Sequence, residues 1–141
     1  MKNSSQYYDA VLLIARVGLS LVFILSGLMK FTDLSGTAGY IASVSLPSPA
    51  LFAFLAALVE TVAGLFILVG FKARLSAWAL VVFVLLATVF FHIDFADQLQ
   101  TTMLLKNLAI VGGLLYVAVC GAGVWSADEK MIPKTQKEPF A

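Results

Sequence analysis

The chain has 141 residues, of which 61% are hydrophobic and 12% are charged, and its formal net charge is +1. Soluble domains are about 45–50% apolar and about 25% charged, so this composition is typical of a membrane protein and excludes an ordinary soluble domain. The small net charge and the lack of a basic cluster argue against a nucleic-acid partner. The single cysteine, Cys120, excludes an internal disulfide and a CxxC thiol pair.

Four apolar segments are long enough to cross a bilayer, which takes about 20 residues of helix. They are predicted, in chain order, at residues 9–31, 49–71, 75–93 and 103–125. The sequence therefore predicts an all-α fold, a transmembrane up-down-up-down four-helix bundle that forms a single domain over residues 1–126.

The segments between and after the spans differ in character. Residues 32–48 are predicted to contain a short helix on the membrane surface, because three apolar residues recur there at helical spacing. These are Leu34, Ala38 and Ile41. The link at residues 72–74 is so short that the second and third spans must be antiparallel neighbours. Residues 127–141 are polar and predicted to be a disordered cytoplasmic tail.

Basic residues set the expected orientation through the positive-inside rule. Six of them fall on the side of the chain termini: Lys2, Lys72, Arg74, Lys130, Lys134 and Lys137. The opposite side has only Lys30 and Lys106, both at span ends. We therefore expect both termini to lie in the cytoplasm, with the lipid bilayer around the four spans.

Ionisable residues inside a span are costly, so each of them is a candidate for function. Arg16 lies about two turns into the first span, and Glu60 lies near the middle of the second. Counted from the predicted cytoplasmic ends, they lie about 10 Å and about 16 Å deep, which predicts an Arg16–Glu60 ion pair or a water-bridged network. Two interpretations stay open. The pair fixes helix register, or Glu60 handles a proton or binds the polar end of a ligand.

A second polar group is predicted where the spans end on the outer side. Its members are Lys30, His92, Lys106 and Asn107, which can line a polar mouth for the head of a small amphipathic ligand. For the two lysines, snorkelling to the interface is the simpler interpretation. No metal site is expected, because His92-x-Asp94 supplies fewer ligands than a structural zinc ion needs.

Several short motifs follow one another along the chain. They are Ala15-Arg16, Ser26-Gly27-x-x-Lys30-Phe31, Leu58-Val59-Glu60, Phe91-His92, Lys106-Asn107-Leu108-Ala109 and Gly121-x-Gly123-x-Trp125-Ser126-x-Asp128. In order and spacing the chain resembles the DoxX-like family of small bacterial four-span inner-membrane proteins, from about Leu12 to Asp128.

That resemblance implies a place in the bacterial cytoplasmic (inner) membrane and a link to redox chemistry. Members of the family include a subunit of a thiosulfate:quinone oxidoreductase, so a quinone ligand and redox protein subunits as partners are what the resemblance implies. It marks Arg16, Glu60, His92, Lys106 and Asn107 as candidate residues and leaves the catalytic residues and the substrate unknown.

Three functions follow as hypotheses. The first is a membrane subunit of an oxidoreductase system that binds a quinone or similar lipophilic redox molecule in a polar bundle core, with no cofactor intrinsic to the chain. The second is a non-enzymatic membrane partner or anchor for another protein. The third is a small lipid or solute transporter, for which a homodimer could form the pathway.

Overall fold

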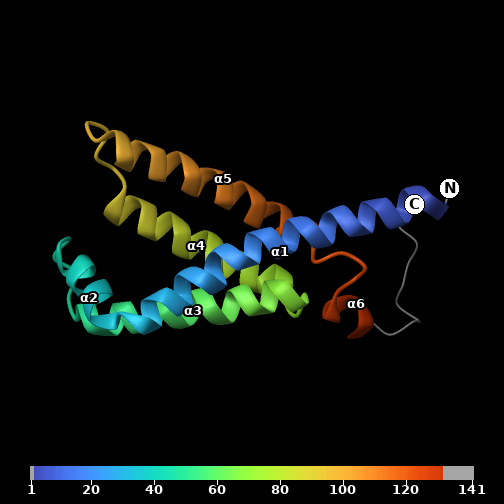
Figure 1. The fold of residues 1–141 in the computed structure, drawn as a ribbon, viewed down its shortest axis with the longest axis horizontal. Coiled ribbons are helices and arrows are strands. Elements are labelled where there is room, and N and C mark those ends of the chain that lie inside the picture. The colour runs from blue at the N-terminus through green and yellow to red at the C-terminus, as the bar shows by residue number, and fades with distance from the viewer. Residues whose placement is uncertain (1, 132–141) are drawn as a thin grey trace.

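The computed structural model describes residues 2–131, with side chains from residue 6 onward. Throughout this part of the chain the regular structure is helical, which confirms the all-α prediction. The helices are α1 (Lys2–Thr32), α2 (Leu34–Ala42), α3 (Pro49–Val69), α4 (Ala73–Phe91), α5 (Gln98–Cys120) and α6 (Ala127–Met131), as Figure 1 shows.

Four of these helices, α1, α3, α4 and α5, are long and apolar enough to cross a membrane. Only 22–33% of the residues in each apolar window are buried inside the protein. Most of the apolar side chains therefore face outward, where lipid would surround them, and the prediction of four spans is confirmed.

The predicted span ends are wrong by several residues, most of all for α5, which covers 98–120 rather than 103–125. At its start, the Asp97 carboxylate accepts a hydrogen bond from the Leu99 backbone N–H at 2.8 Å, a side-chain N-cap. At its end, Gly121 has φ +85°, a conformation that L side chains rarely adopt, and it terminates the helix. Polar and glycine caps therefore set these ends, and the apolar run does not.

The smaller shifts concern the other spans. The helix α1 begins at Lys2 rather than at residue 9, α3 ends at Val69 rather than at 71, and α4 covers 73–91 rather than 75–93. Gly70, with φ +69°, separates α3 from α4 and explains the early end of α3.

The spans alternate in direction, as predicted, and they pack as two pairs (Figure 1). The helix α1 lies along α3, α5 lies along α4, and α3 joins the pairs through α4. We call the end at which α1 begins and α6 lies the terminal end, and the end with α2 and the α4–α5 connection the loop end. Which end faces the cytoplasm stays a prediction from the basic residues.

Two glycines allow α1 and α3 to pack closely. A Cβ at Gly27 would lie 2.8 Å from the Thr61 backbone nitrogen and 2.9 Å from the Ala57 carbonyl oxygen. A Cβ at Gly64 would lie 3.0 Å from Cγ1 of Ile24. Small residues that let helix backbones approach are the usual basis of helix association in lipid. This contact sets the register between the two helices.

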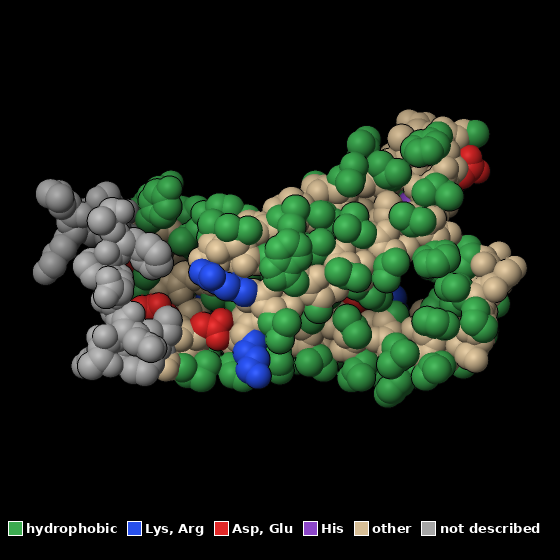
Figure 2. Space-filling model, turned by 180° about the vertical axis from the view of Figure 1, so that it is seen from behind, with side chains coloured by type: hydrophobic (Ala, Val, Ile, Leu, Met, Phe, Trp, Pro, Cys, Tyr) green, Lys and Arg blue, Asp and Glu red, His purple; other side chains and the backbone are tan. Residues whose placement is uncertain are grey.

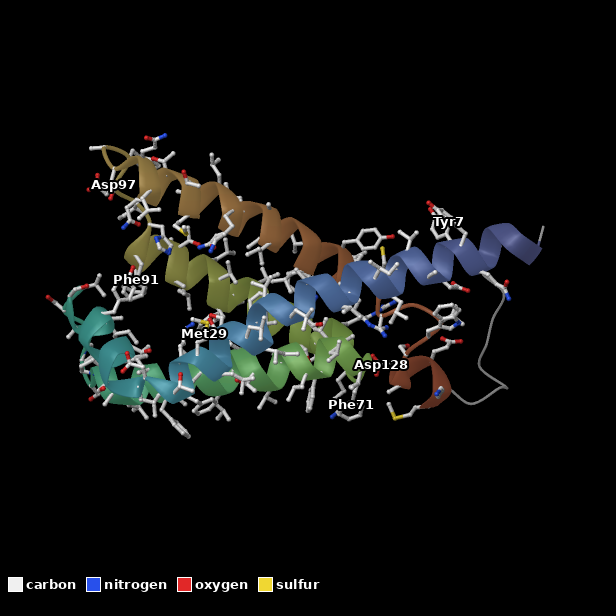
Figure 3. All side chains as sticks on the ribbon, viewed as in Figure 1. Tyr7, Met29, Phe71, Phe91, Asp97 and Asp128 are labelled. Carbon is white, nitrogen blue, oxygen red and sulfur yellow. The ribbon has the colours of Figure 1, made fainter. Side chains whose placement is uncertain are left out.

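The short helix predicted in residues 32–48 is α2, whose N-terminus is capped by Asp33 through the Gly36 backbone N–H at 2.8 Å. It packs on α3. The Tyr40 ring stacks on Phe91 at the end of α4, with ring centroids 4.9 Å apart. Figure 3 shows Phe91 opposite α2 at the loop end. The stack therefore bridges the two helix pairs there.

Candidate functional site

In the described part of the chain, a partly buried ion pair joins Lys30 of α1 to Glu60 of α3. Lys30 Nζ lies 2.7 Å from Glu60 Oε2 and also donates to Ser26 Oγ at 2.7 Å. The Glu60 side chain is 8% exposed and that of Lys30 is 26% exposed. One end of the pair is therefore enclosed, while the ammonium group is still accessible.

The direction of the Lys30 side chain follows from its helix. Helical side chains lean toward the N-terminus of their own helix, so Lys30, near the end of α1, leans back into the bundle and over Ser26. Glu60 lies about 16 Å along α3 from the loop end, within reach of that side chain. The simpler interpretation of Lys30 from sequence, snorkelling to the interface, is therefore wrong.

The predicted Arg16–Glu60 pair is also wrong, because Arg16 lies near the terminal end. Its guanidinium donates to the carbonyl oxygens of Ala122 and Trp125, the latter at 2.8 Å. Counted from the loop end, Arg16 lies about 24 Å along α1 and Glu60 about 16 Å along α3. The prediction relied on the Arg16 side chain to cover the difference in depth, but a helical side chain leans toward the N-terminus of its own helix, which in α1 is away from Glu60.

Asn107 lies in a second polar contact, between α4 and α5. Its side-chain amide donates to Thr88 Oγ1 at 2.8 Å, and the Thr88 hydroxyl donates to the Val84 carbonyl oxygen at 2.7 Å. Asn107 and Thr88 are both buried. This chain of hydrogen bonds satisfies two buried polar groups and joins the second helix pair.

The remaining two predicted residues lie at the loop end. His92 Nδ1 is 2.6 Å from Gln100 Oε1, which connects the end of α4 to the start of α5. Lys106 is exposed. The predicted polar mouth thus consists of separate contacts, of which only the Lys30–Glu60 pair crosses between spanning helices as an ion pair.

The space beside this ion pair is open. Figure 2 shows the surface hollowed at the loop end between the α4–α5 pair and the α2–α3 side, with charged side chains visible inside the hollow. An open groove of about 590 Å³ follows the loop-end half of α1 and reaches Thr37 in α2, and both Lys30 and Ser26 line it. The ion pair is therefore reachable by a ligand with a polar head and an apolar body.

A second cluster, at the terminal end, escaped the sequence analysis. After α5 the chain folds back across α3 and α4, and the Asp128 carboxylate accepts hydrogen bonds from the backbone N–H groups of Lys72 at 2.6 Å and Ala73 at 2.9 Å. The Asp128 N–H donates to the Gly70 carbonyl oxygen at 2.8 Å. Figure 3 shows Asp128 beside the α3–α4 turn.

This cluster changes the interpretation of the predicted tail. Residues 127–131 form α6 and are held by Asp128 and by the Arg16 contacts to the preceding loop, while residues 132–141 lie outside the described residues. The closing motif Trp125-Ser126-x-Asp128 was the available signal, but nothing in it indicated a partner 55 residues earlier in the chain.

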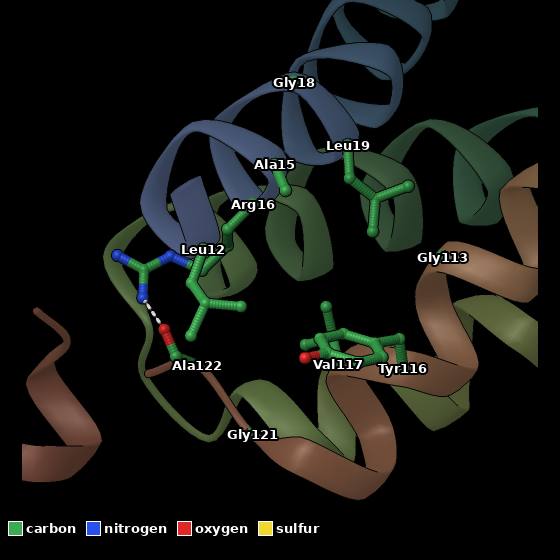
Figure 4. Close-up of a pocket in the computed structure, with 10 residues that line it drawn as sticks. All are labelled: Leu12, Ala15, Arg16, Gly18, Leu19, Gly113, Tyr116, Val117, Gly121 and Ala122. Carbon is green, nitrogen blue, oxygen red and sulfur yellow. Dashed lines mark hydrogen bonds between the residues drawn. The ribbon is translucent and has the colours of Figure 1, made fainter. Parts of the chain in front are cut away.

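A groove of about 400 Å³ lies between α1 and α5 in the terminal half of the bundle, and Arg16 is one of its lining residues (Figure 4). Its other walls are mainly apolar. Among the described residues, no group of three or more His, Cys, Asp or Glu side chains is placed to hold a metal ion.

Comparison with known proteins finds a matching family model and similar inner membrane proteins. The family model described as DoxX matches residues 11–93. The chain is 36% identical over 126 residues to "Inner membrane protein YqjF" of Escherichia coli (strain K12), covering 89% of this chain and 95% of that protein. It is 32% identical over 139 residues to "Inner membrane protein YphA" of the same organism, covering 91% and 99%. No solved structure matches the chain significantly.

Proposed function

Because this chain belongs to the DoxX family and is an integral inner-membrane protein, we propose that it is the membrane subunit of an oxidoreductase system and binds a quinone or similar lipophilic redox molecule. The proposed site is the Lys30–Glu60 ion pair and the open space beside it.

The observation that carries this proposal is an ion pair that helix packing does not need. Placing charges at this depth in a membrane is expensive, and an apolar contact would hold two helices together at lower cost. The α1–α3 contact already has close packing at Gly27 and Gly64. An ion pair that is costly to bury, partly accessible and not required for helix association fits a role in ligand binding or proton transfer.

The residues present suit the head of a quinone. The Lys30 ammonium can donate a hydrogen bond to a quinone carbonyl oxygen, and the Glu60 carboxylate can accept or supply a proton. The bound molecule supplies the redox chemistry, and the electrons would come from a redox subunit beside this chain. Lys30 then holds and orients the head, while Glu60 moves protons.

The space between the helix pairs suits the apolar body of such a ligand. The space between the helix pairs gives access from the lipid, and the Tyr40–Phe91 stack limits access from the loop end itself. A molecule dissolved in the bilayer would therefore reach the ion pair sideways, without crossing the polar surface.

The test is mass spectrometry of organic extracts from the whole chain purified in mild detergent. Wild type is compared with Glu60→Gln, which keeps size and an acceptor for Lys30 but removes the charge and the titration. Lys130→Gln is the control, because it also removes one charge and changes an exposed residue in α6. We expect one lipophile near a molar equivalent in wild type and control, and at least about a tenfold loss in Glu60→Gln.

Equal retention in all three proteins, or bulk phospholipid only, would refute the proposal. The ion pair would then serve helix register, and anchoring of another protein would become the better function to test, by pull-down from membranes. Thermal unfolding of each variant, followed by circular dichroism, separates a lost ligand from a lost fold.

A further inference from the structure

Arg16 is a buried cation that forms no contact ion pair with another described residue, although the Asp128 carboxylate acts on it through space. The residue is 4% exposed, and among the described residues the salt bridge that forms is Lys30–Glu60, not one to Arg16. Its two hydrogen bonds go to the carbonyl oxygens of Ala122 and Trp125, and its Nε is buried without a partner. A guanidinium has five N–H donors, so Arg16 keeps donors to spare for an anion.

The groove beside Arg16 has the shape and lining for an apolar chain. It is about 400 Å³ in volume and lies between α1, which contributes Leu12 and Leu19, and α5, which contributes Gly113 and Val117. In Figure 4 Arg16 and Ala122 lie at one end of the groove, and Leu19 and Gly113 lie at the other. One cation at the end of an apolar trough matches an amphipathic anion.

The level of Arg16 in the bundle indicates what that anion is. Arg16 lies beside Gly70, where α3 ends, since a Cβ at Gly70 would lie 3.0 Å from the Arg16 guanidinium. The exposed Arg74 lies at the same level, next to Gly121. Spans end where lipid headgroups begin, so both arginines lie at the expected depth of phosphate groups.

We propose that the groove binds an anionic phospholipid, with one acyl chain between α1 and α5 and the phosphate held by Arg16. The site differs from the Lys30–Glu60 site in position and in ligand, and it does not depend on the proposed redox function. It is a lipid site of the leaflet that surrounds the terminal end, which the basic residues predict to be the cytoplasmic one.

Two adjacent glycines of α5 allow a matched test. Gly113 lines the groove, and its Cβ would lie 3.5 Å from Leu19, an ordinary contact, so Gly113→Leu would fill the groove without touching Arg16. Gly112 is exposed and a Cβ there would meet nothing within 4 Å, so Gly112→Leu makes the same chemical change outside the groove. The experiment is native mass spectrometry of the full chain, stripped of lipid and titrated with dioleoyl phosphatidylglycerol or dioleoyl phosphatidylcholine.

We expect wild type and Gly112→Leu to bind phosphatidylglycerol about tenfold more tightly than phosphatidylcholine, as charge-assisted hydrogen bonds to one arginine would produce. Gly113→Leu should lose about tenfold in phosphatidylglycerol affinity, while Glu60→Gln should bind it as wild type does. Equal affinity of wild type for the two lipids, or equal behaviour of the two glycine variants, would overturn the proposal.

Discussion

The helix α4 is capped from far along the chain, and this predicts a measurable loss of stability when Asp128 is changed. Its N-cap residue, Lys72, has φ 45° and makes no side-chain cap hydrogen bond. Asp128 instead supplies the acceptor for the backbone N–H groups of Lys72 and Ala73. The perturbation is Asp128→Ala, with Asp128→Asn as a milder change that keeps an acceptor.

The expected magnitude follows from the bonds that are lost. Removing an N-cap side chain costs about 0.5–2 kcal/mol. The carboxylate charge at a helix N-terminus contributes about 0.3–1 kcal/mol more. Asp128 is half-buried, so in the variant water can supply part of the hydrogen bonding that the backbone N–H groups lose. We therefore expect Asp128→Ala to lower the free energy of unfolding by about 2 kcal/mol and Asp128→Asn by about 0.5–1 kcal/mol.

The assay is reversible unfolding of the detergent-solubilised chain by SDS, followed by tryptophan fluorescence. Lys130→Ala is the control, because Lys130 is an exposed residue two positions away in α6. A loss for Asp128→Ala no greater than that for the control would show that Asp128 does not cap α4. Equal losses for the Asn and Ala variants would show that a neutral acceptor does not replace the carboxylate, so that its charge carries the effect.

Two further predictions concern packing inside the bundle. Gly27→Ala places a methyl group against the α3 backbone, 2.8 Å from Thr61 N, and should lower the free energy of unfolding by about 1–3 kcal/mol. Gly112→Ala meets open space and should be neutral or stabilise the protein by up to about 1 kcal/mol. The same unfolding titration compares the two variants, and equal effects would contradict the close α1–α3 contact. Thr88→Val and Asn107→Leu each leave a buried partner unsatisfied, so a double-mutant cycle should give a coupling of about 0.6 kcal/mol. Simple additivity would show that their hydrogen bond contributes nothing.

The sequence by itself determined the number of spans, their alternating direction and the short helix α2. A lipid-exposed backbone has to satisfy its own hydrogen bonds, so about 20 apolar residues in a row specify a spanning helix without help from the rest of the fold. Short links then determine which spans are antiparallel. These are local properties, and they can be read from composition and spacing.

The partners of the polar residues could not be predicted from the sequence in the same way. Sequence reasoning picked out Arg16, Lys30 and Glu60 as polar residues of the spans but paired the wrong two. The pairing depends on the direction in which each side chain leans and on where Gly27 meets α3. An error of one or two turns in that register moves a side chain by about 5–10 Å, more than the reach of a hydrogen bond.

The contacts at the terminal end also could not be predicted fully from the sequence. Its caps at Gly70 and Gly121 were readable in principle, because glycine commonly follows a helix. The Asp128 contact to Lys72 and Ala73 was not readable, because it joins segments more than fifty residues apart. Only tertiary structure decided which charges are buried together, since helix ends and apolar runs are encoded locally while register between helices is set by side-chain packing across the bundle.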